Sequence, residues 1–178
     1  MTRQITLEQI VDFLSETPMF GDLKPRELAE VVHIMTLQTL RPGQFAFREG
    51  DVGDAWYVVH DGGVEVLKKT RDGDQMLATL GPRACFGEMA ILDGSPRSAS
   101  VRATQDTLVF RFPRDRFNEL LNTGNLSAFK LVHQMALVLV ARQRQITTRL
   151  AQLLASEKHG EELRDNLHPL ISASSVTE

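Results

Sequence analysis

One stretch of the sequence, Phe86-Gly-Glu-Met-Ala-Ile-Leu-Asp-Gly-Ser-Pro-Arg-Ser-Ala-Ser-Val101, combines residue types that together could bind a phosphorylated sugar. Gly87 lets the backbone approach a ligand closely, and Glu88 to Leu92 can form one or two helical turns, whose unpaired N–H groups attract anions. Arg97 can donate a forked pair of hydrogen bonds to a phosphate. Glu88 only accepts hydrogen bonds, so it suits a ribose hydroxyl better than a phosphate.

The alternative interpretation of this stretch is a barrel loop in which Glu88 and Arg97 simply pair with each other. Two charged side chains buried in a barrel lose much of their hydration, and the attraction between them alone rarely offsets that desolvation penalty. A ligand that carries both a hydroxyl and a phosphate would engage each side chain. The combination of glycine, short helix, acid, proline and arginine therefore favours a ligand site.

The chain has three regions with different sequence patterns, and these patterns predict the elements that position this stretch. Residues 1–40 are predicted to form a helical segment, with apolar residues at helical spacing from Ile10 to Leu14 and again from Leu28 to Met35. Pro25 is a good first-turn residue for the second of these helices.

Residues 41–113 are predicted to form an antiparallel jelly-roll β-barrel, so that the fold class is mainly β with flanking helices. Glycines recur about every ten residues, and short β-prone runs lie between them. Arg71-Asp-Gly-Asp is typical of a hairpin loop. The predicted strands are Gln44–Phe47, Ala55–Val59, Val64–Lys68, Met76–Leu80, Ser98–Ala103 and Thr107–Phe112.

Residues 114–158 are predicted to be helical again, with a short helix at Arg114–Leu121 and a long one from about Leu126 to Ser156. The long helix carries an a/d seam, which favours a homodimer through residues 126–156. The alternative is that this face packs on the chain's own barrel. Residues 159–178 are predicted to be a flexible tail. The seam consists of Val132, Ala136, Leu139, Gln143, Ile146, Leu150 and Leu153.

The segment Phe86-Gly-Glu-Met-Ala-Ile-Leu, followed by Pro96-Arg-Ser-Ala, resembles the phosphate-binding cassette of the cyclic-nucleotide-binding domain family. That family includes the catabolite activator protein and the regulatory subunits of protein kinase A. The likeness runs from Phe20-Gly-Asp-Leu through Phe47-Arg-Glu-Gly-Asp and Ala78-Thr-Leu-Gly-Pro to about Leu154. Where many members have Gly-Asp before the cassette, this chain has Pro82-Arg-Ala-Cys, and we expect Cys85 to be a small buried residue.

The resemblance implies a jelly roll with the nucleotide inside and the cassette at residues 86–101. It implies that the Gly87 amide and the Glu88 carboxylate hold the ribose 2′-hydroxyl, and that Arg97 binds the cyclic phosphate. The full set of ligand-binding residues carried over from the family is Phe86, Gly87, Glu88, Met89, Ala90, Pro96, Arg97, Ser98 and Ala99, with Arg142 and Gln143 of the long helix near the base.

The resemblance also bears on the identity of the nucleotide. Ser98 after the arginine is similar to the cAMP-binding bacterial regulators, whereas cGMP-dependent kinases prefer threonine there, so cAMP is favoured over cGMP. Gln143 could bond a base edge and Arg142 could stack on a purine. An alignment shifted by one helical turn would instead place Met135, Leu139 or Ile146 near the base. Nucleotide entry is expected to close the long helix over the base as a lid.

Composition restricts the remaining function classes. Net charge is -3 with no strongly basic block, which argues against direct nucleic-acid binding. The single cysteine, Cys85, suits a reducing cytoplasm, and neither a signal peptide nor a membrane span is recognisable. We expect a cytoplasmic protein that acts through an unidentified protein partner.

Two further alternatives stay open from the sequence. A metal-dependent jelly-roll enzyme would need two histidines and a carboxylate in the barrel, but there is no His-x-His pair and His60 is expected at the surface. We therefore expect no enzyme, no metal and no cofactor. A docking barrel without a ligand is disfavoured by the presence of Gly87, Glu88 and Arg97. The helix-turn-helix domain of the family's transcription factors is not expected in this chain, because only a short acidic stretch follows Ser156. The chain is then either a free-standing sensor that works through a partner or a piece of a longer protein.

Overall fold

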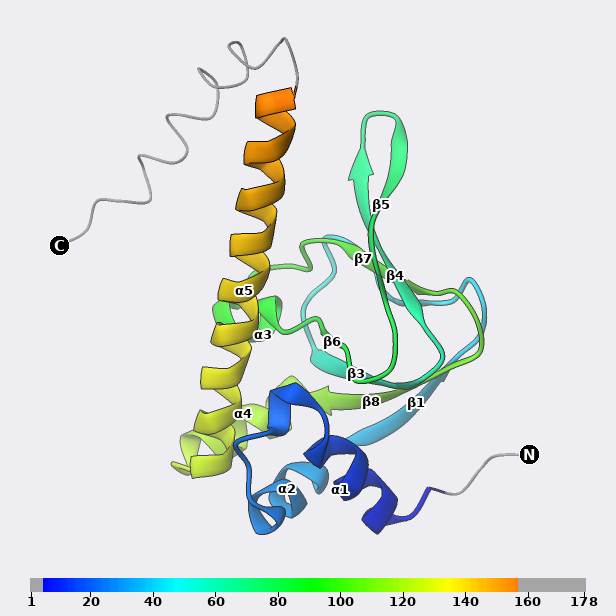
Figure 1. Ribbon diagram of the computed structural model, residues 1–178. Helices are drawn as coiled ribbons and strands as arrows, with labels where there is room; N and C mark the ends of the chain where they lie inside the picture. The colour runs from blue at the N-terminus through cyan, green and yellow to red at the C-terminus, as the bar shows by residue number, and fades with distance from the viewer. Residues whose placement is uncertain (1–4, 157–178) are drawn as a thin grey trace, which may run out of the picture. The chain divides into compact units, whose positions relative to one another are not determined.

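The computed structural model describes residues 5–156, whose helices and strands are shown in Figure 1. Within these residues α1 (Leu7–Ser15), the 3₁₀ turn η1 (Pro18–Phe20) and α2 (Pro25–Val32) come first, eight strands follow, and α4 (Arg114–Asn122) and α5 (Leu126–Ser156) come last. Thr6 caps α1, because its hydroxyl accepts a hydrogen bond from the Gln9 amide while the Gln9 side chain accepts one from the Thr6 amide.

The strands form two antiparallel four-stranded sheets, which confirms the predicted mainly β, jelly-roll-like class with flanking helices. Sheet A has the order β1-β8-β3-β6 and sheet B the order β2-β7-β4-β5. The one-turn helix α3 (Met89–Asp93) lies between β6 and β7, so the chain passes from sheet A to sheet B through it. The strand bounds are β1 Thr36–Leu40, β2 Phe45–Phe47, β3 Ala55–Asp61, β4 Val64–Thr70, β5 Gly73–Leu80, β6 Cys85–Phe86, β7 Ser100–Ala103 and β8 Thr107–Pro113.

Residues 36–40 correct the expectation that helical structure extends to Leu40. They form β1, which pairs with β8 from Thr36 opposite Arg111 to Leu40 opposite Thr107. The partner strand lies 75 residues away along the chain, so no local period reveals the pairing. Helix α2 ends at Val32, and the first sheet begins shortly afterwards.

Two turns of the barrel follow from the residues that form them. The hairpin predicted at Arg71–Asp74 is confirmed, with Thr70 paired to Gly73. At the turn before β4, Gly62 has φ +89°, and a Cβ there would lie 2.5 Å from the Asp106 carbonyl oxygen. Only glycine fits this turn, because a side chain would meet both an unfavourable φ and a collision with backbone.

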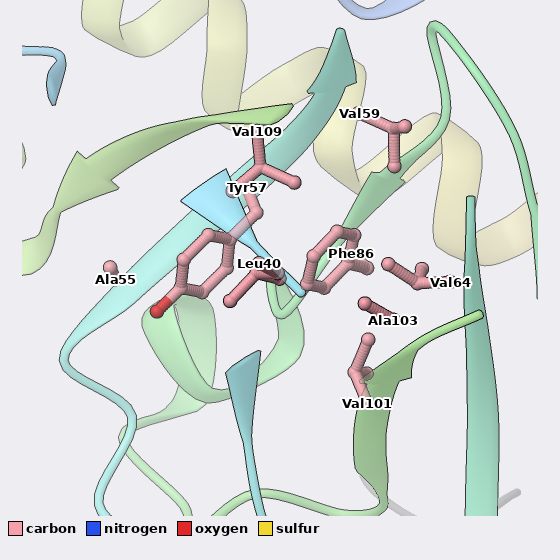
Figure 2. Packing of buried hydrophobic residues seen from close by; sticks show 9 residues of the cluster. All are labelled: Leu40, Ala55, Tyr57, Val59, Val64, Phe86, Val101, Ala103 and Val109. Carbon is pink, nitrogen blue, oxygen red and sulfur yellow. The ribbon is translucent and has the colours of Figure 1, made fainter. Parts of the chain in front are cut away.

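The interior of the barrel is filled by aliphatic and aromatic side chains from both sheets, as Figure 2 shows. Tyr57 and Phe86 stack at its centre, with ring centroids 5.0 Å apart. In Figure 2 the phenol oxygen of Tyr57 points away from Phe86, toward the side on which Ala55 lies. The buried members of this cluster are Leu40, Ala55, Tyr57, Val59, Val64, Phe86, Val101, Ala103 and Val109.

The outer face of sheet A is also buried, because helices cover it. Trp56 of β3 is fully buried and stacks on Phe112 of β8 at 4.1 Å between centroids. Phe20 of η1 and Phe117 of α4 contact the same indole ring, at 5.9 Å and 6.1 Å. A strand buried on both faces requires a continuous apolar run, which explains why Ala55–Val59 shows no alternation.

The chain divides into two compact units, residues 1–135 and 136–178, and α5 begins in the first and continues into the second. In the first unit, the start of α5 is tied to α2: Lys130 pairs with Glu27 at 2.8 Å, and Glu30 accepts hydrogen bonds from Asn125 and Ser127. Across the described residues, no single helix has the length and apolar character to cross a membrane, although the bent pair α4 and α5 together meets that test on length and composition.

Candidate anion-binding site

Arg97 is held at the level of its backbone by the loop that joins β2 to β3. The Arg97 amide donates to the Asp51 carbonyl, and the Arg97 carbonyl accepts from the Gly50 amide, both at 2.9 Å. These two bonds fix where the side chain leaves the chain just before β7. The cassette therefore enters sheet B in a position set by a segment about fifty residues earlier.

The Arg97 guanidinium points into the protein, and its side chain is only 1% exposed. Its Nη1 donates to the Gly87 carbonyl at 2.9 Å, and its Nη2 donates to the Ala55 carbonyl at 2.6 Å and to the Asp54 carboxylate at 3.2 Å. The Phe47 ring lies under the guanidinium carbon at 3.9 Å, in cation–π geometry.

The charge of Arg97 is only partly compensated. Burial lowers the pKa of Arg97, whereas Tyr57 and Asp54 act to raise it. Among the described residues its Nε is a buried donor with no hydrogen-bond partner. A desolvated cation with an unused donor favours an anionic partner, and the guanidinium edge that carries Nε suits a phosphate.

Gly87 allows the cassette to lie against this guanidinium. Its φ is +79°, and a Cβ at this position would lie 2.8 Å from Nη1 of Arg97 and 3.2 Å from the Phe47 ring. The positive φ therefore favours glycine, and any other residue would also have to displace the Arg97 guanidinium or the Phe47 ring. The prediction that Gly87 serves a close backbone approach gains a second reason here, because the group that approaches is Arg97 itself.

Helix α3 follows Gly87 and is pressed onto the barrel. Glu88 precedes it and is 1% exposed, so the cassette has two buried ionisable side chains, the acidic Glu88 and the basic Arg97. Ala90 packs so closely on Gly53 that a Cβ on Gly53 would lie 2.4 Å from the Ala90 Cβ. Arg114 of α4 donates to the carbonyls of both Gly53 and Ala90, at 3.1 Å and 3.0 Å.

The C-terminal end of the cassette is hydrogen-bonded to sheet B. Lys68 of β4 donates to the Ser98 carbonyl and to Glu49, both at 2.7 Å. The Lys68 hydrogen bond, followed by the Lys69 amide, lowers the pKa of Glu49. The Ser98 hydroxyl lies 3.8 Å from the Met89 sulfur, on the exposed side of the cassette.

The cassette residues of the predicted site lie together in the structure but differ in burial. Phe86 and Ala90 are buried, whereas Met89 and Pro96 are exposed and Ala99 is half-buried. Arg142 and Gln143 lie on α5 in the second unit, so their contact with a base stays a prediction.

Three residues that contact the Arg97 guanidinium are absent from the predicted site: Phe47, Asp54 and Ala55. Phe47 begins the motif Phe47-Arg-Glu-Gly-Asp, which is part of the family resemblance, but the sequence alone does not indicate its contact with Arg97. The signal that could have revealed Asp54 is its place directly before the buried strand β3, where its carboxylate lies at the mouth of the barrel although the side chain itself is 60% exposed.

His60 corrects a second expectation, since it is not a free surface residue. Its ring stacks on Phe110 at 4.9 Å and meets the Phe13 ring edge at 4.6 Å. Cys85 is buried, as expected. Among residues 5–156 no three His, Cys, Asp or Glu side chains come together as a group that could hold a metal ion.

The fold is a two-sheet barrel, and the segment that crosses between its sheets carries the buried Arg97. Residues 37–123 match the family model for the cyclic nucleotide-binding domain. The chain is 38% identical over 109 residues to a cAMP-dependent protein kinase regulatory subunit of Yarrowia lipolytica, a match that covers 61% of this chain and 28% of that protein. It is 33% identical over 143 residues to the cyclic AMP receptor protein of Thermus thermophilus, covering 80% and 64%.

Solved structures give the same result. A cyclic nucleotide-binding domain from Methylobacillus flagellatus superposes with a TM-score of 0.72 at 29% identity, covering 82% of each chain. The catabolite activator protein of T. thermophilus superposes with a TM-score of 0.68 at 31% identity, covering 76% of this chain and 62% of that one.

The chain belongs to the cyclic nucleotide-binding domain family and is related to catabolite activator proteins and protein kinase A regulatory subunits. It spans about a quarter of the length of the kinase regulatory subunits that it matches and 64% of the bacterial receptor protein.

Proposed function

We propose that this chain is a regulatory sensor that binds a cyclic nucleoside monophosphate in its barrel. Arg97 binds the cyclic phosphate, and Gly87 with Glu88 binds the ribose 2′-hydroxyl. The observation that carries the proposal is the buried guanidinium of Arg97, whose Nε has no partner among the described residues. Residues Phe86, Met89, Ala90, Pro96, Ser98 and Ala99 complete the cassette around them.

We propose cAMP as the preferred nucleotide. Ser98 after the arginine supports this choice, and the matched kinase subunits and bacterial receptor carry cAMP in their names. Arg142 and Gln143 of α5 are proposed to meet the base. Through that contact, nucleotide binding changes the populations of α5 arrangements and passes the signal to a partner protein.

The distal part of α5 supports a second proposal, a homodimer formed through this helix. Of the a/d seam, Ile146 and Leu153 are about 60% exposed and Leu150 is 37% exposed. An apolar stripe at heptad spacing is the usual surface for a second helix. Sedimentation equilibrium is expected to give a dimer for the parent chain and a monomer for Ile146→Glu/Leu153→Glu. A parent that stays monomeric at 100-fold higher protein concentration would contradict the dimer.

Isothermal titration calorimetry with cAMP, cGMP and AMP tests the main proposal. The parent is expected to bind cAMP more tightly than cGMP and to give no heat with AMP at the same concentrations. Arg97→Ala is expected to weaken cAMP binding by at least about thirtyfold, because losing one partner of a buried charge pair costs about 2 kcal/mol or more. Arg97→Lys keeps the charge but loses the fork, so intermediate affinity is expected.

A matched control separates the sugar contact from general damage. The parent is expected to bind 2′-deoxy-cAMP more weakly than cAMP, and Glu88→Gln is expected to lose most of that discrimination. Thermal unfolding without nucleotide checks that each variant is folded. If Arg97→Ala binds cAMP as the parent does, or if no cyclic nucleotide shifts the parent's unfolding temperature, the proposal fails and a ligand-free docking barrel becomes the better description.

A further inference from the structure

Asp54 contacts two arginines at once. Its Oδ1 accepts from Arg97 at 3.2 Å, and its Oδ2 accepts from Arg111 of β8 at 2.6 Å. The two cations differ in exposure, since the Arg97 side chain is 1% exposed and that of Arg111 is 26% exposed. One carboxylate is therefore shared by a buried cation and a half-buried one, and it lies closer to the second.

Arg111 is held in place by more than this ion pair. It lies directly opposite Tyr57 in the pairing of β3 with β8, and burial raises the pKa of the Tyr57 hydroxyl while Arg111 acts to lower it. The Tyr57 ring in turn stacks on Phe86, at the start of the cassette. Arg111 lines an open cleft of about 640 Å³ at this end of the barrel, together with Asp54 and Arg116.

Arg111 interacts with the Asp54 carboxylate more strongly than Arg97 does. Burial acts to raise the pKa of Asp54, but the hydrogen bond and the charge of Arg111, followed by the charge of Arg97, hold it below its ordinary value. The shorter distance from Asp54 to Arg111, 2.6 Å against 3.2 Å to Arg97, leads to the same conclusion. Because the two arginines share one carboxylate, a stronger interaction of Asp54 with Arg111 leaves less of its negative charge to neutralise Arg97.

We propose that Arg111 is a positioning residue that sets the phosphate affinity of Arg97 by drawing the Asp54 carboxylate toward itself. Without Arg111, Asp54 closes fully on Arg97 and competes with the phosphate for the same guanidinium. This inference rests on the proposed function, since the phosphate is that of the cyclic nucleotide. It assigns to β8 a role in ligand affinity that operates through the Asp54 carboxylate.

A double-mutant cycle tests whether Arg111 acts through Asp54. Arg111→Gln is expected to weaken cAMP binding about two- to fivefold, the range of partly exposed ion pairs. In the Asp54→Asn background the same change is expected to have no measurable effect. Arg116→Gln is the matched control, because it removes an exposed arginine of the same cleft with the same change of net charge and is expected to leave affinity unaltered. Arg111→Lys is expected to restore part of the affinity.

Two results would overturn the inference. If Arg111→Gln weakens binding equally in the parent and in the Asp54→Asn background, Arg111 acts by its own charge and not through the carboxylate. If Arg116→Gln matches Arg111→Gln, the effect is one of net charge alone.

A measurement without nucleotide keeps the inference separate from the proposed function. The Nε–Hε resonance of Arg97, assigned by its loss in Arg97→Lys, reports the surroundings of the guanidinium. Arg111→Gln is expected to shift this resonance as Asp54 closes on Arg97, whereas Arg116→Gln is not. An unshifted resonance in Arg111→Gln refutes the inference, whether or not the parent chain binds cAMP.

Discussion

The two sheets of the barrel are buried to different degrees. In sheet A, β3 is covered on both faces, with the first five of its residues buried. In sheet B, the first seven residues of β5 are exposed and only Leu80 is half-buried. Sheet A thus forms a scaffold fixed by helices on one side and by the barrel core on the other. Sheet A therefore supplies the buried part of the scaffold, whereas Arg97 contacts residues of both sheets, Ala55 of β3 and Phe47 of β2, and β5 contributes little to the core.

The largest effect is expected at the centre of sheet A. Trp56→Ala removes an indole that contacts Phe20, Phe112 and Phe117, so it should lower the free energy of unfolding by about 3–5 kcal/mol. Met76→Ala in β5 is the matched control, since Met76 is 60% exposed, and a change within about 0.5 kcal/mol is expected. Urea unfolding measures both. Similar losses for the two variants would show that β3 and β5 contribute equally to stability.

A smaller effect, dependent on pH, is expected where sheet A meets α1. Burial lowers the pKa of His60 below its ordinary value of 6.5, although Asp61 acts to raise it. The folded protein therefore keeps His60 neutral, while the unfolded chain takes up the proton more readily. Stability from His60 is present above pH 6.5 and is lost as the pH falls below it.

His60→Phe removes the titration while keeping a ring between Phe13 and Phe110. Urea unfolding between pH 7.5 and 5 should show the parent losing more stability than this variant, by an amount smaller than that at Trp56. A variant that follows the parent's pH profile throughout would show that His60 is not the responsible group.

Much of this architecture is predictable from the sequence because its signals are local. Glycine spacing, β-prone runs and the hairpin at Arg71–Asp74 predict the barrel, and the cassette motif predicts that Gly87, Glu88 and Arg97 lie near one another. The long helix at Leu126–Ser156 follows from its period and length. In each case the residues that determine the element lie within it or next to it.

What could not be predicted depends on residues far apart in the chain. Strand β1 is defined by its pairing with β8, and Asp54 reaches Arg97 across 43 residues. His60 lies at the end of a strand, so its sequence position gives no hint that Phe13 of α1 covers it. Such contacts are created by the topology, and a local pattern carries no information about them.

The position of α3 between β6 and β7 has a consequence for cooperativity. Gly87 follows a strand of one sheet, and Arg97 precedes a strand of the other. A ligand held by both residues adds non-covalent bonds across the two layers at the point where the chain crosses between them. Its binding free energy therefore stabilises the sandwich against separation of its sheets, and the barrel and its ligand should melt as one unit.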